Sequence, residues 1–280
     1  MRAIRLPSDS ATQPALVVPV LAAIAGAAAL WLRQRRFTTR VERLGGAALE
    51  TLLGAIDAND PVTGAHVRRV ARYALVLAHA RGVSEHESHS VERVALFHDI
   101  GKIHEALFDV IHDDRKLTPE ERRAIRTHPA RGARVLEPLA AFYPDLAAGV
   151  IAHHERWDGS GYPEGLRGKR IPLAARIVAI ADTFDAVTHS RRYRRGRSIQ
   201  RGRDVIAAGR GTEFDPLLVD LFLSPPVQER VIHEMRQAAA IEGGRLSHRP
   251  KHGEHLDAPD VSFRWRATVP DERHALRARR

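Results

Sequence analysis

The chain has 280 residues, of which 44 are Lys or Arg and 34 are Asp or Glu, so its formal net charge is +10. With 44% hydrophobic and 28% charged residues, the composition excludes a wholly disordered chain and a membrane protein with many spans. Because cysteine is absent, disulfides, thiolate metal sites, iron–sulfur clusters and a cysteine nucleophile are excluded too. Any bound metal would have to be held by His, Asp, Glu or water.

The run from Ala15 to Leu32 carries no formal charge, and as a helix it would be roughly 27 Å long at about 1.5 Å per residue. That length approaches the thickness of a bilayer's hydrocarbon core, so we expect one transmembrane helix in an N-terminal anchor over residues 1–36. Arginine is denser after the run than before it, which predicts a single-pass protein with the following residues in the cytoplasm. A cleaved signal peptide and a buried helix are the alternatives.

Residues 37–60 are predicted to form a connecting helix. Apolar side chains recur in it at spacings near three and four, which is typical of a helix that pairs with a second copy of itself in a homodimer. The pair Gly45-Gly46 interrupts this pattern, so the homodimer is left open.

Beyond Pro61 the sequence reads as successive amphipathic helices, and no alternating apolar run predicts a strand. Thr63 is a candidate N-cap for the first of these helices, and Thr118 with Glu121 fits a capping box. The expected fold class is therefore all-α, a helical bundle. Residues 61–224 are predicted to be the main domain, and 225–280 a C-terminal helix with a mobile basic tail. The expected helices are 65–81, 87–103, 119–127, 129–140, 145–157, 172–188, 198–208, 216–223 and 226–240.

Sixteen histidines require sorting, and most of them, His189 included, lie in polar contexts that solvent exposure explains. The remaining histidines and two aspartates come from four or five predicted helices, which is typical of a metal centre inside a helical bundle. The seven candidate ligands are His66, His98, Asp99, His128, His153, His154 and Asp182. Seven groups exceed one octahedral ion, so two ions with Asp99 as a bridge are expected. Nitrogen and oxygen donors favour iron or manganese, with zinc left open.

Four motifs contain six of these seven ligands: His98–Lys102, Thr127–Pro129, the run His153–Pro163 and Ala181–Thr188. Together they resemble the HD-GYP family of cyclic di-GMP phosphodiesterases, within the HD-domain superfamily of metal-dependent phosphohydrolases. The resemblance covers about residues 57–223. It implies an HD-type all-α fold and the same seven metal ligands. In some family members a glutamate four residues before the first histidine supports a third metal, but Val62 stands there in this chain, so a two-metal centre is expected.

The resemblance also implies the activity. The expected reaction is hydrolysis of cyclic di-GMP to linear pGpG by a metal-bridging hydroxide, in bacterial second-messenger signalling at the inner membrane, with GMP as a further product left open. Asp99 and Lys102 are the expected catalytic residues. Lys102 is further expected to meet a phosphate oxygen of the substrate, where its positive charge would stabilise the reaction and its proton could go to the leaving oxygen. Asp185, Arg191 and Arg194 fall where the family places groups that face the substrate.

The loop that contains Gly161-Tyr162-Pro163 is, by the same resemblance, a lip of the active site or a surface for a diguanylate cyclase partner. Two other functions remain open: an HD-type phosphohydrolase for another nucleotide, and a non-catalytic module that binds cyclic di-GMP or a protein partner. Nucleic-acid binding is not expected, because the positive charge is spread out and no reading helix is evident.

Overall fold

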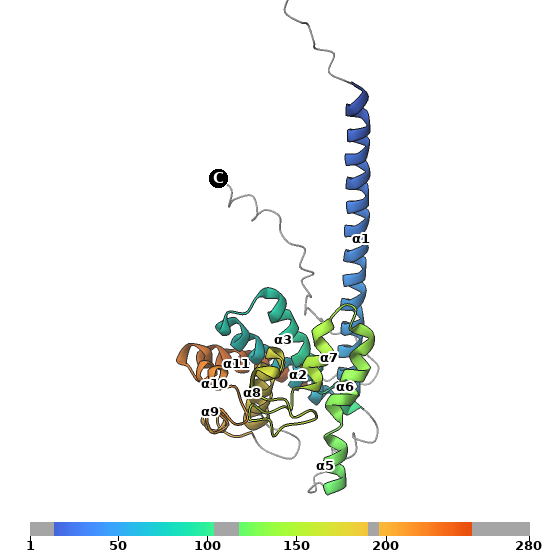
Figure 1. Cartoon of the computed structure of the whole chain (residues 1–280). Coiled ribbons are helices and arrows are strands. Elements are labelled where there is room, and N and C mark those ends of the chain that lie inside the picture. The colour runs from blue at the N-terminus through green and yellow to red at the C-terminus, as the bar shows by residue number, and fades with distance from the viewer. Residues whose placement is uncertain (1–13, 104–117, 190–195, 248–280) are drawn as a thin grey trace, which may run out of the picture. The chain divides into compact units, whose positions relative to one another are not determined.

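The computed structural model describes residues 14–103, 118–189 and 196–247 (Figure 1). The chain divides into two compact units, one ending at Ala47 and the other beginning at Ala48. The domain boundaries expected after residues 36, 60 and 224 stay predictions. The described residues end at Ser247, so the expected mobile tail lies outside them.

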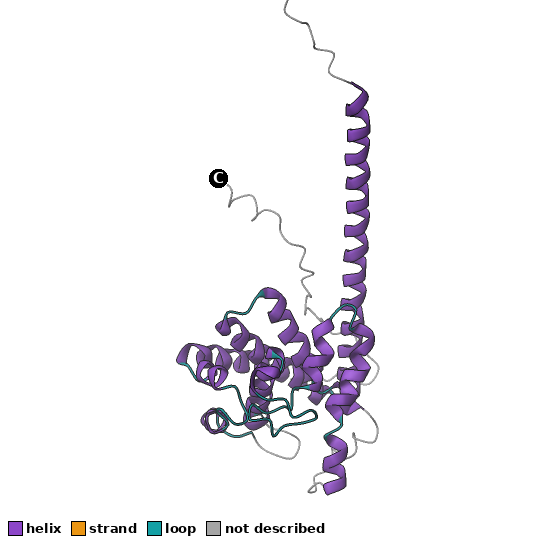
Figure 2. Cartoon of the chain, in the orientation of Figure 1, coloured by secondary structure: helices purple, strands orange, loops and turns teal. Residues whose placement is uncertain are grey.

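Every regular element in the described part of the chain is helical, as Figure 2 shows. The α-helices and short 3-10 helices (η) are α1 (Pro14–Asn59), α2 (Pro61–Arg81), α3 (Glu85–Phe97), η1 (Ile100–Ile103), α5 (Pro119–Ile125), α6 (His128–Leu136), η2 (Glu137–Leu139), α7 (Pro144–Ile151), η3 (Gly168–Arg170), α8 (Leu173–Thr188), α9 (Ile199–Ala208), α10 (Pro216–Phe222) and α11 (Pro225–Ser247). The prediction of an all-α chain is confirmed.

The N-terminal helix differs from the expectation in two ways. Helix α1 continues through Gly45 and Gly46, so the expected anchor and connecting helix are one element. Among the residues that the structure describes, no helix is both long and apolar enough to cross a membrane, and the expected transmembrane helix in residues 1–36 is therefore not supported.

The last turns of α1 bury the side chains of one face of the helix. Leu49, Leu53 and Ile56 are buried, at the spacings of four and three residues that place side chains on one side of a helix. Leu44, one of the recurring apolar residues of the expected connecting helix, is 67% exposed. The homodimer stays a prediction.

Local capping fixes where the next helices begin. Asp60, and not Thr63, is the N-cap of α2: its carboxylate accepts hydrogen bonds from the Val62 amide at 3.0 Å and from the Thr63 hydroxyl at 2.6 Å. Asp60 is the cap because it precedes the helix and accepts from a free amide of its first turn, whereas Thr63 already lies within the helix. The capping box of Thr118 and Glu121 is confirmed at the start of α5.

The core lies where α2, α3 and α8 pack against one another, with α10 and α11 against α2 and with α7 against α3. Tyr73 of α2 and Phe184 of α8 meet edge to face with their ring centroids 5.9 Å apart, and Phe222 of α10 packs on Phe184 at 5.3 Å. All three rings are fully buried. This aromatic contact holds α2 and α8 together, and both of them carry candidate metal ligands.

Four helices, α3, α5, α6 and α7, end two or more residues earlier than the sequence pattern indicates, and two of these ends bear on the ligands. We expected the pairs His98-Asp99 and His153-His154 inside helices, but α3 ends at Phe97 and α7 ends at Ile151. Both pairs therefore lie just beyond a helix C-terminus. Ile100 and Ala152 beyond these ends are buried as well, so the sequence pattern alone does not reveal the change of backbone direction.

A close contact between α7 and α3 yields a stability prediction. A Cβ atom at Gly149 would lie 2.3 Å from a methyl carbon of Val94. We expect Gly149→Ala to destabilise the fold by about 1–3 kcal/mol, the usual cost of extra volume in a packed interior. The free energy of unfolding from urea titration measures it.

Gly54 provides the matched control, since a Cβ atom there meets nothing within 4 Å. Gly54→Ala on the exposed side of α1 should raise stability by about 0.5–1 kcal/mol because alanine favours the helix. A Gly149→Ala protein as stable as the Gly54→Ala protein would contradict the packing contact.

Candidate metal centre

The seven ligand candidates gather around one site, although they come from five parts of the second unit. His66 lies in α2 and Asp182 in α8, while the others lie at or beside helix ends: His98 and Asp99 after α3, His128 at the start of α6, and His153 and His154 after α7.

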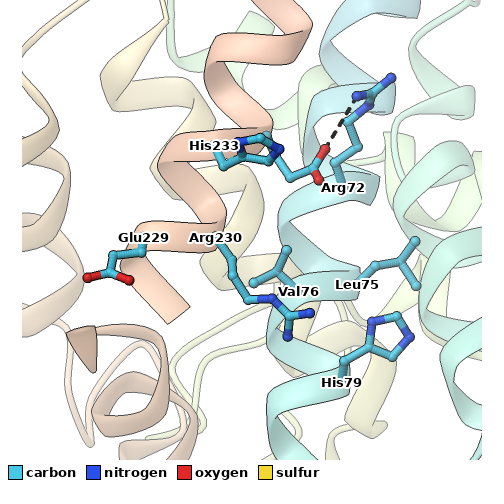
Figure 3. Close-up of a pocket in the computed structure, with 8 residues that line it drawn as sticks. Arg72, Leu75, Val76, His79, Glu229, Arg230 and His233 are labelled. Atoms are coloured by element: carbon cyan, nitrogen blue, oxygen red, sulfur yellow. Dashed lines mark hydrogen bonds and ion pairs between the residues drawn. The ribbon is translucent and has the colours of Figure 1, made fainter. Parts of the chain in front are cut away.

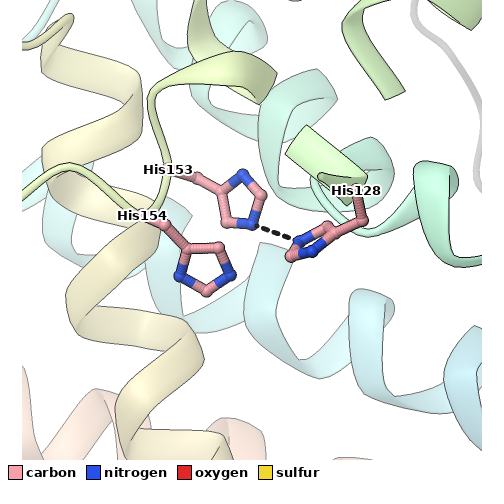
Figure 4. Close-up of side chains that lie close together, drawn as sticks. All are labelled: His128, His153 and His154. Carbon is pink, nitrogen blue, oxygen red and sulfur yellow. Dashed lines mark hydrogen bonds between the residues drawn. The ribbon is translucent and has the colours of Figure 1, made fainter. Parts of the chain in front are cut away.

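Two groups of three donors face each other across the site. His128, His153 and His154 form one group, in which one donor atom from each lies within 4.8 Å of the others (Figure 4). His66, His98 and Asp182 form the second group by the same measure. Each group is the size of a set of protein ligands that leaves coordination positions free for water or substrate. The arrangement can therefore hold two ions.

Asp99 lies between the two groups and turns one oxygen toward each. Its Oδ2 is 3.5 Å from His98 Nε2 and 3.9 Å from His66 Nε2. Its Oδ1 is 3.3 Å from His128 Nε2 and 3.9 Å from His153 Nε2. This is the geometry expected of a carboxylate that bridges two ions.

The helix ends explain the orientation of three imidazoles. The Nδ1 atom of each lies at hydrogen-bond distance from the carbonyl oxygen three residues earlier: His98 from Ala95 at 2.8 Å, His128 from Ile125 at 2.7 Å and His153 from Val150 at 2.6 Å. The last carbonyls of a helix have no amide partner within it, so α3, α5 and α7 offer them to the rings. With Nδ1–H donating to a carbonyl, each ring presents an unprotonated Nε2 to the centre.

The fourth oriented ring, His66, is held by a carboxylate instead. Its Nδ1 lies 2.7 Å from Asp185 Oδ2, and Arg69 donates to both oxygens of the same carboxylate, from Nε at 2.8 Å and from Nη2 at 3.1 Å. His189 Nδ1 lies 3.0 Å from Asp185 Oδ1. Asp185 was expected to face the substrate, but it is buried and its oxygens are engaged by these three side chains, so it lies behind His66 and orients it.

Burial and neighbouring charge keep three imidazoles neutral. Burial lowers the pKa of His98, and it lowers that of His153 well below the usual value, with a further lowering from His154. Burial and the neighbouring His128 lower the pKa of His154 to about 4. Neutral rings at pH 7 are the form that binds a metal ion.

The acidic groups remain ionised although they are buried. Burial by itself would raise the pKa of Asp99, but Lys102 and His98 outweigh it and hold that pKa well below its usual value. Hydrogen bonding to His66 likewise lowers the pKa of Asp182 against the effect of burial. Burial also acts to lower the pKa of His66, yet hydrogen bonds to Asp182 and Asp185 raise it to about 9. A metal ion would take the place of the proton on His66 Nε2, the nitrogen that lies 3.3 Å from Asp182 Oδ1.

Two buried atoms support the fit to a metal. Among the described residues, His98 Nε2 and Asp99 Oδ1 are buried and have no hydrogen-bond partner. Leaving such groups unpaired costs free energy unless a cation coordinates them. The donors are imidazole nitrogens and carboxylate oxygens without sulfur, a set that suits iron or manganese. Val62, where a third-metal ligand would stand, is 53% exposed and has no donor atom.

Lys102 lies at the more open side of the centre. Its Nζ donates to Asp99 Oδ2 at 2.6 Å, and its side chain is 28% exposed, beside 22% for Asp182. The side chains of His98, His128 and His153 are exposed by 1% or less. A ligand therefore has access from the side of Lys102 and Asp182. Arg191 and Arg194, also expected at the substrate, lie outside the described residues.

A separate cavity of about 540 Å³ lies between α2 and α11 (Figure 3). Basic and acidic side chains surround a short apolar floor of Leu75 and Val76, and Arg72 pairs with Glu234 at 3.3 Å beside them. The cavity is lined by Arg72, Leu75, Val76, His79, Glu229, Arg230, His233 and Glu234, so it contains none of the seven candidate ligands.

Sequence reasoning missed the network behind His66. His189 was set aside as a surface residue, and Arg69 was not considered. One signal was available: Asp185 and His189 are four residues apart in a helical segment, the spacing that brings side chains together on one face. The contact of Arg69 with Asp185 joins α2 to α8 across 116 residues, which helical periodicity does not encode.

Comparisons with known proteins agree on a single family. A family model described as HD domain matches residues 50–218. The 3'3'-cGAMP-specific phosphodiesterase 2 of Vibrio cholerae is 38% identical over 174 residues, covering 61% of this chain and 33% of that protein. The cyclic di-GMP phosphodiesterase response regulator RpfG of Xanthomonas campestris is 37% identical over 220 residues, covering 77% and 58%. A cyclic di-GMP phosphodiesterase of Thermotoga maritima is 32% identical over 225 residues, covering 79% and 60%. The chain thus spans between a third and three fifths of these relatives' own length.

The position of Asp99 between the two donor groups predicts how metal content responds to mutation. After equilibration with Mn²⁺, the chain should retain about two ions, one for each group of three donors. Asp99→Ala should retain fewer than one, because one of its oxygens faces each group, whereas His128→Ala should affect mainly its own group. Elemental analysis after gel filtration measures the content.

His86→Ala is the control, since His86 is 75% exposed on α3 and should leave the content unchanged. An Asp99→Ala protein that folds and still holds two ions would contradict the bridging geometry.

Proposed function

This chain belongs to the HD domain family, its resemblance to the HD-GYP proteins is confirmed, and from that premise we propose that it is a metal-dependent phosphodiesterase that hydrolyses cyclic di-GMP to linear pGpG. The observation that carries the proposal is the carboxylate of Asp99, with one oxygen toward each group of donors. Two ions held there would supply the positive charge that binds a phosphodiester and would activate water for attack on it.

The chain's own residues provide the rest of the chemistry. A phosphodiester is an anion, so it requires cationic groups at the open side of the centre. Lys102 is placed there, and its ammonium group would neutralise charge on a phosphate oxygen or give a proton to the leaving 3′ oxygen. Arg191 and Arg194 remain proposed phosphate contacts.

The substrate is proposed from relatives of two kinds. RpfG and the Thermotoga protein are named for cyclic di-GMP, whereas the first Vibrio protein is named for 3'3'-cGAMP. The two cyclic dinucleotides differ in one base, so both fit a centre that acts on the phosphodiester. We favour cyclic di-GMP because the Gly161-Tyr162-Pro163 signature is that of the HD-GYP proteins.

The activity test uses the full chain loaded with Fe²⁺ or Mn²⁺ without oxygen. We expect it to convert cyclic di-GMP to pGpG, with slower turnover of 3'3'-cGAMP, and we expect Asp99→Ala to reduce the rate to background. Chromatography of the products identifies each species. Metal-loaded protein that leaves both dinucleotides intact would overturn the proposal, and faster turnover of 3'3'-cGAMP would overturn the choice of substrate.

Lys102 is tested by a pair of substitutions. Lys102→Met removes the charge, and we expect kcat to fall by about 10²- to 10³-fold, the usual cost of losing one group that stabilises developing charge. Lys102→Arg keeps the charge and should retain most of the activity if neutralisation is the main role. Metal content is measured in parallel, since the direct contact with Asp99 could alter it. Unchanged kcat in Lys102→Met would exclude the residue from the reaction.

A further inference from the structure

One ligand, His154, lacks the support that the other four imidazoles have. The rings of His66, His98, His128 and His153 each have Nδ1 at hydrogen-bond distance from an oxygen. Within the described residues, no such hydrogen bond is formed by His154. An imidazole without one is free to rotate about its side-chain bonds, so another contact must fix its orientation for metal binding.

The His154 ring is held by ring contacts instead. Two are with the other ligands of its group, His153 and His128, at centroid distances of 4.1 and 5.0 Å, and the third is with a tyrosine outside the ligand set. The ring of Tyr162 stacks on the His154 ring, with centroids 5.0 Å apart and an interplanar angle of 23°. The guanidinium of Arg126 lies over the Tyr162 ring, 4.3 Å from its centroid. The Tyr162 amide also donates to the His154 carbonyl at 3.3 Å. Ring and backbone of Tyr162 therefore both engage the ligand.

The loop that carries Tyr162 is fastened on both sides of the ring. Before it, a Cβ atom on Gly161 would lie 2.3 Å from the Arg156 nitrogen, so only glycine allows this approach to the backbone next to His154. After it, the buried carboxylate of Glu155 accepts from the amides of Glu164 at 2.7 Å and Leu166 at 3.0 Å. Glu155 directly follows His154, so the loop is folded back onto the segment that bears the ligand.

We propose that Tyr162 is a positioning residue whose ring fixes the imidazole of His154 and so completes the donor group of His128, His153 and His154 (Figure 4). The guanidinium of Arg126, which lies over the Tyr162 ring, restrains that ring in turn. The proposal rests on the metal centre of the proposed function and not on its substrate. It assigns the Gly161-Tyr162-Pro163 loop a role within the chain, whereas contact of this loop with a diguanylate cyclase stays a separate prediction.

The test compares two substitutions of the full chain. Tyr162→Phe keeps the stacked ring, and Tyr162→Ala removes it. We expect Tyr162→Phe to bind two Mn²⁺ ions as the unmodified chain does, and Tyr162→Ala to bind one of them about 10- to 100-fold more weakly, the usual effect of losing a group that orients a ligand. Isothermal titration with Mn²⁺ measures both affinities.

Two further variants distinguish the loss of the Tyr162 contact from a general effect of the substitution on folding. Tyr143→Ala is the matched control, because Arg93 lies 4.6 Å over this tyrosine at the start of α7, and both Mn²⁺ affinities should stay unchanged. Arg126→Ala changes an exposed side chain that should not affect folding, and we expect it to weaken the same site about 2- to 5-fold through a less constrained ring. This variant tests the proposal even if Tyr162→Ala fails to fold.

The outcomes separate this proposal from the proposed function. Tyr162→Ala or Arg126→Ala with both affinities unchanged would overturn the positioning role. Loss of metal in Tyr162→Phe as well would show that the hydroxyl and not the stacked ring is required, and would also overturn it. If the unmodified chain binds two ions but hydrolyses neither dinucleotide, the phosphodiesterase proposal fails, while the metal affinities still decide the role of Tyr162.

Discussion

The structure depends on keeping one ionised carboxylate, Asp99, buried between two sets of donor groups. An ionised carboxylate in a protein interior is costly unless opposite charge or hydrogen-bond donors surround it. Lys102 supplies one such partner at 2.6 Å, and imidazole nitrogens occupy most of the remaining surroundings. A pair of divalent ions would meet the same requirement more completely, because each carboxylate oxygen faces its own group of donors.

Helix ends provide the means by which this chain assembles the site. Carbonyls in the last turn of a helix lack amide partners, and in α3, α5 and α7 those partners are imidazole Nδ1 atoms of residues three positions later. A single feature thus satisfies the helix C-terminus and fixes which ring nitrogen faces the centre. The C-terminal end of a helix dipole also favours nearby positive charge, so these ends suit a cation. His154, outside this scheme, is instead stacked on Tyr162.

The support behind the site is as well developed as the ligand set. Asp185 orients His66 and is itself contacted by Arg69 and His189, so one buried carboxylate is held between three side chains. Such partners raise the basicity of a ligating ring and hold it in place. Because Arg69 comes from α2 and Asp185 from α8, the same contact that prepares a ligand also joins two helices of the core.

The sequence by itself determined the all-α class, the capping box at Thr118 and the residue types of the metal site, because helical periodicity, caps and local motifs are properties of neighbouring residues. It did not determine where α3 and α7 end, or that Asp185 lies behind His66 and not at the substrate. The place of Asp185 depends on side chains more than a hundred positions apart in the chain, as in its contact with Arg69. Only the packing of α2 against α8 creates the low-dielectric interior in which those charges must pair, and for that reason the tertiary structure alone decided them.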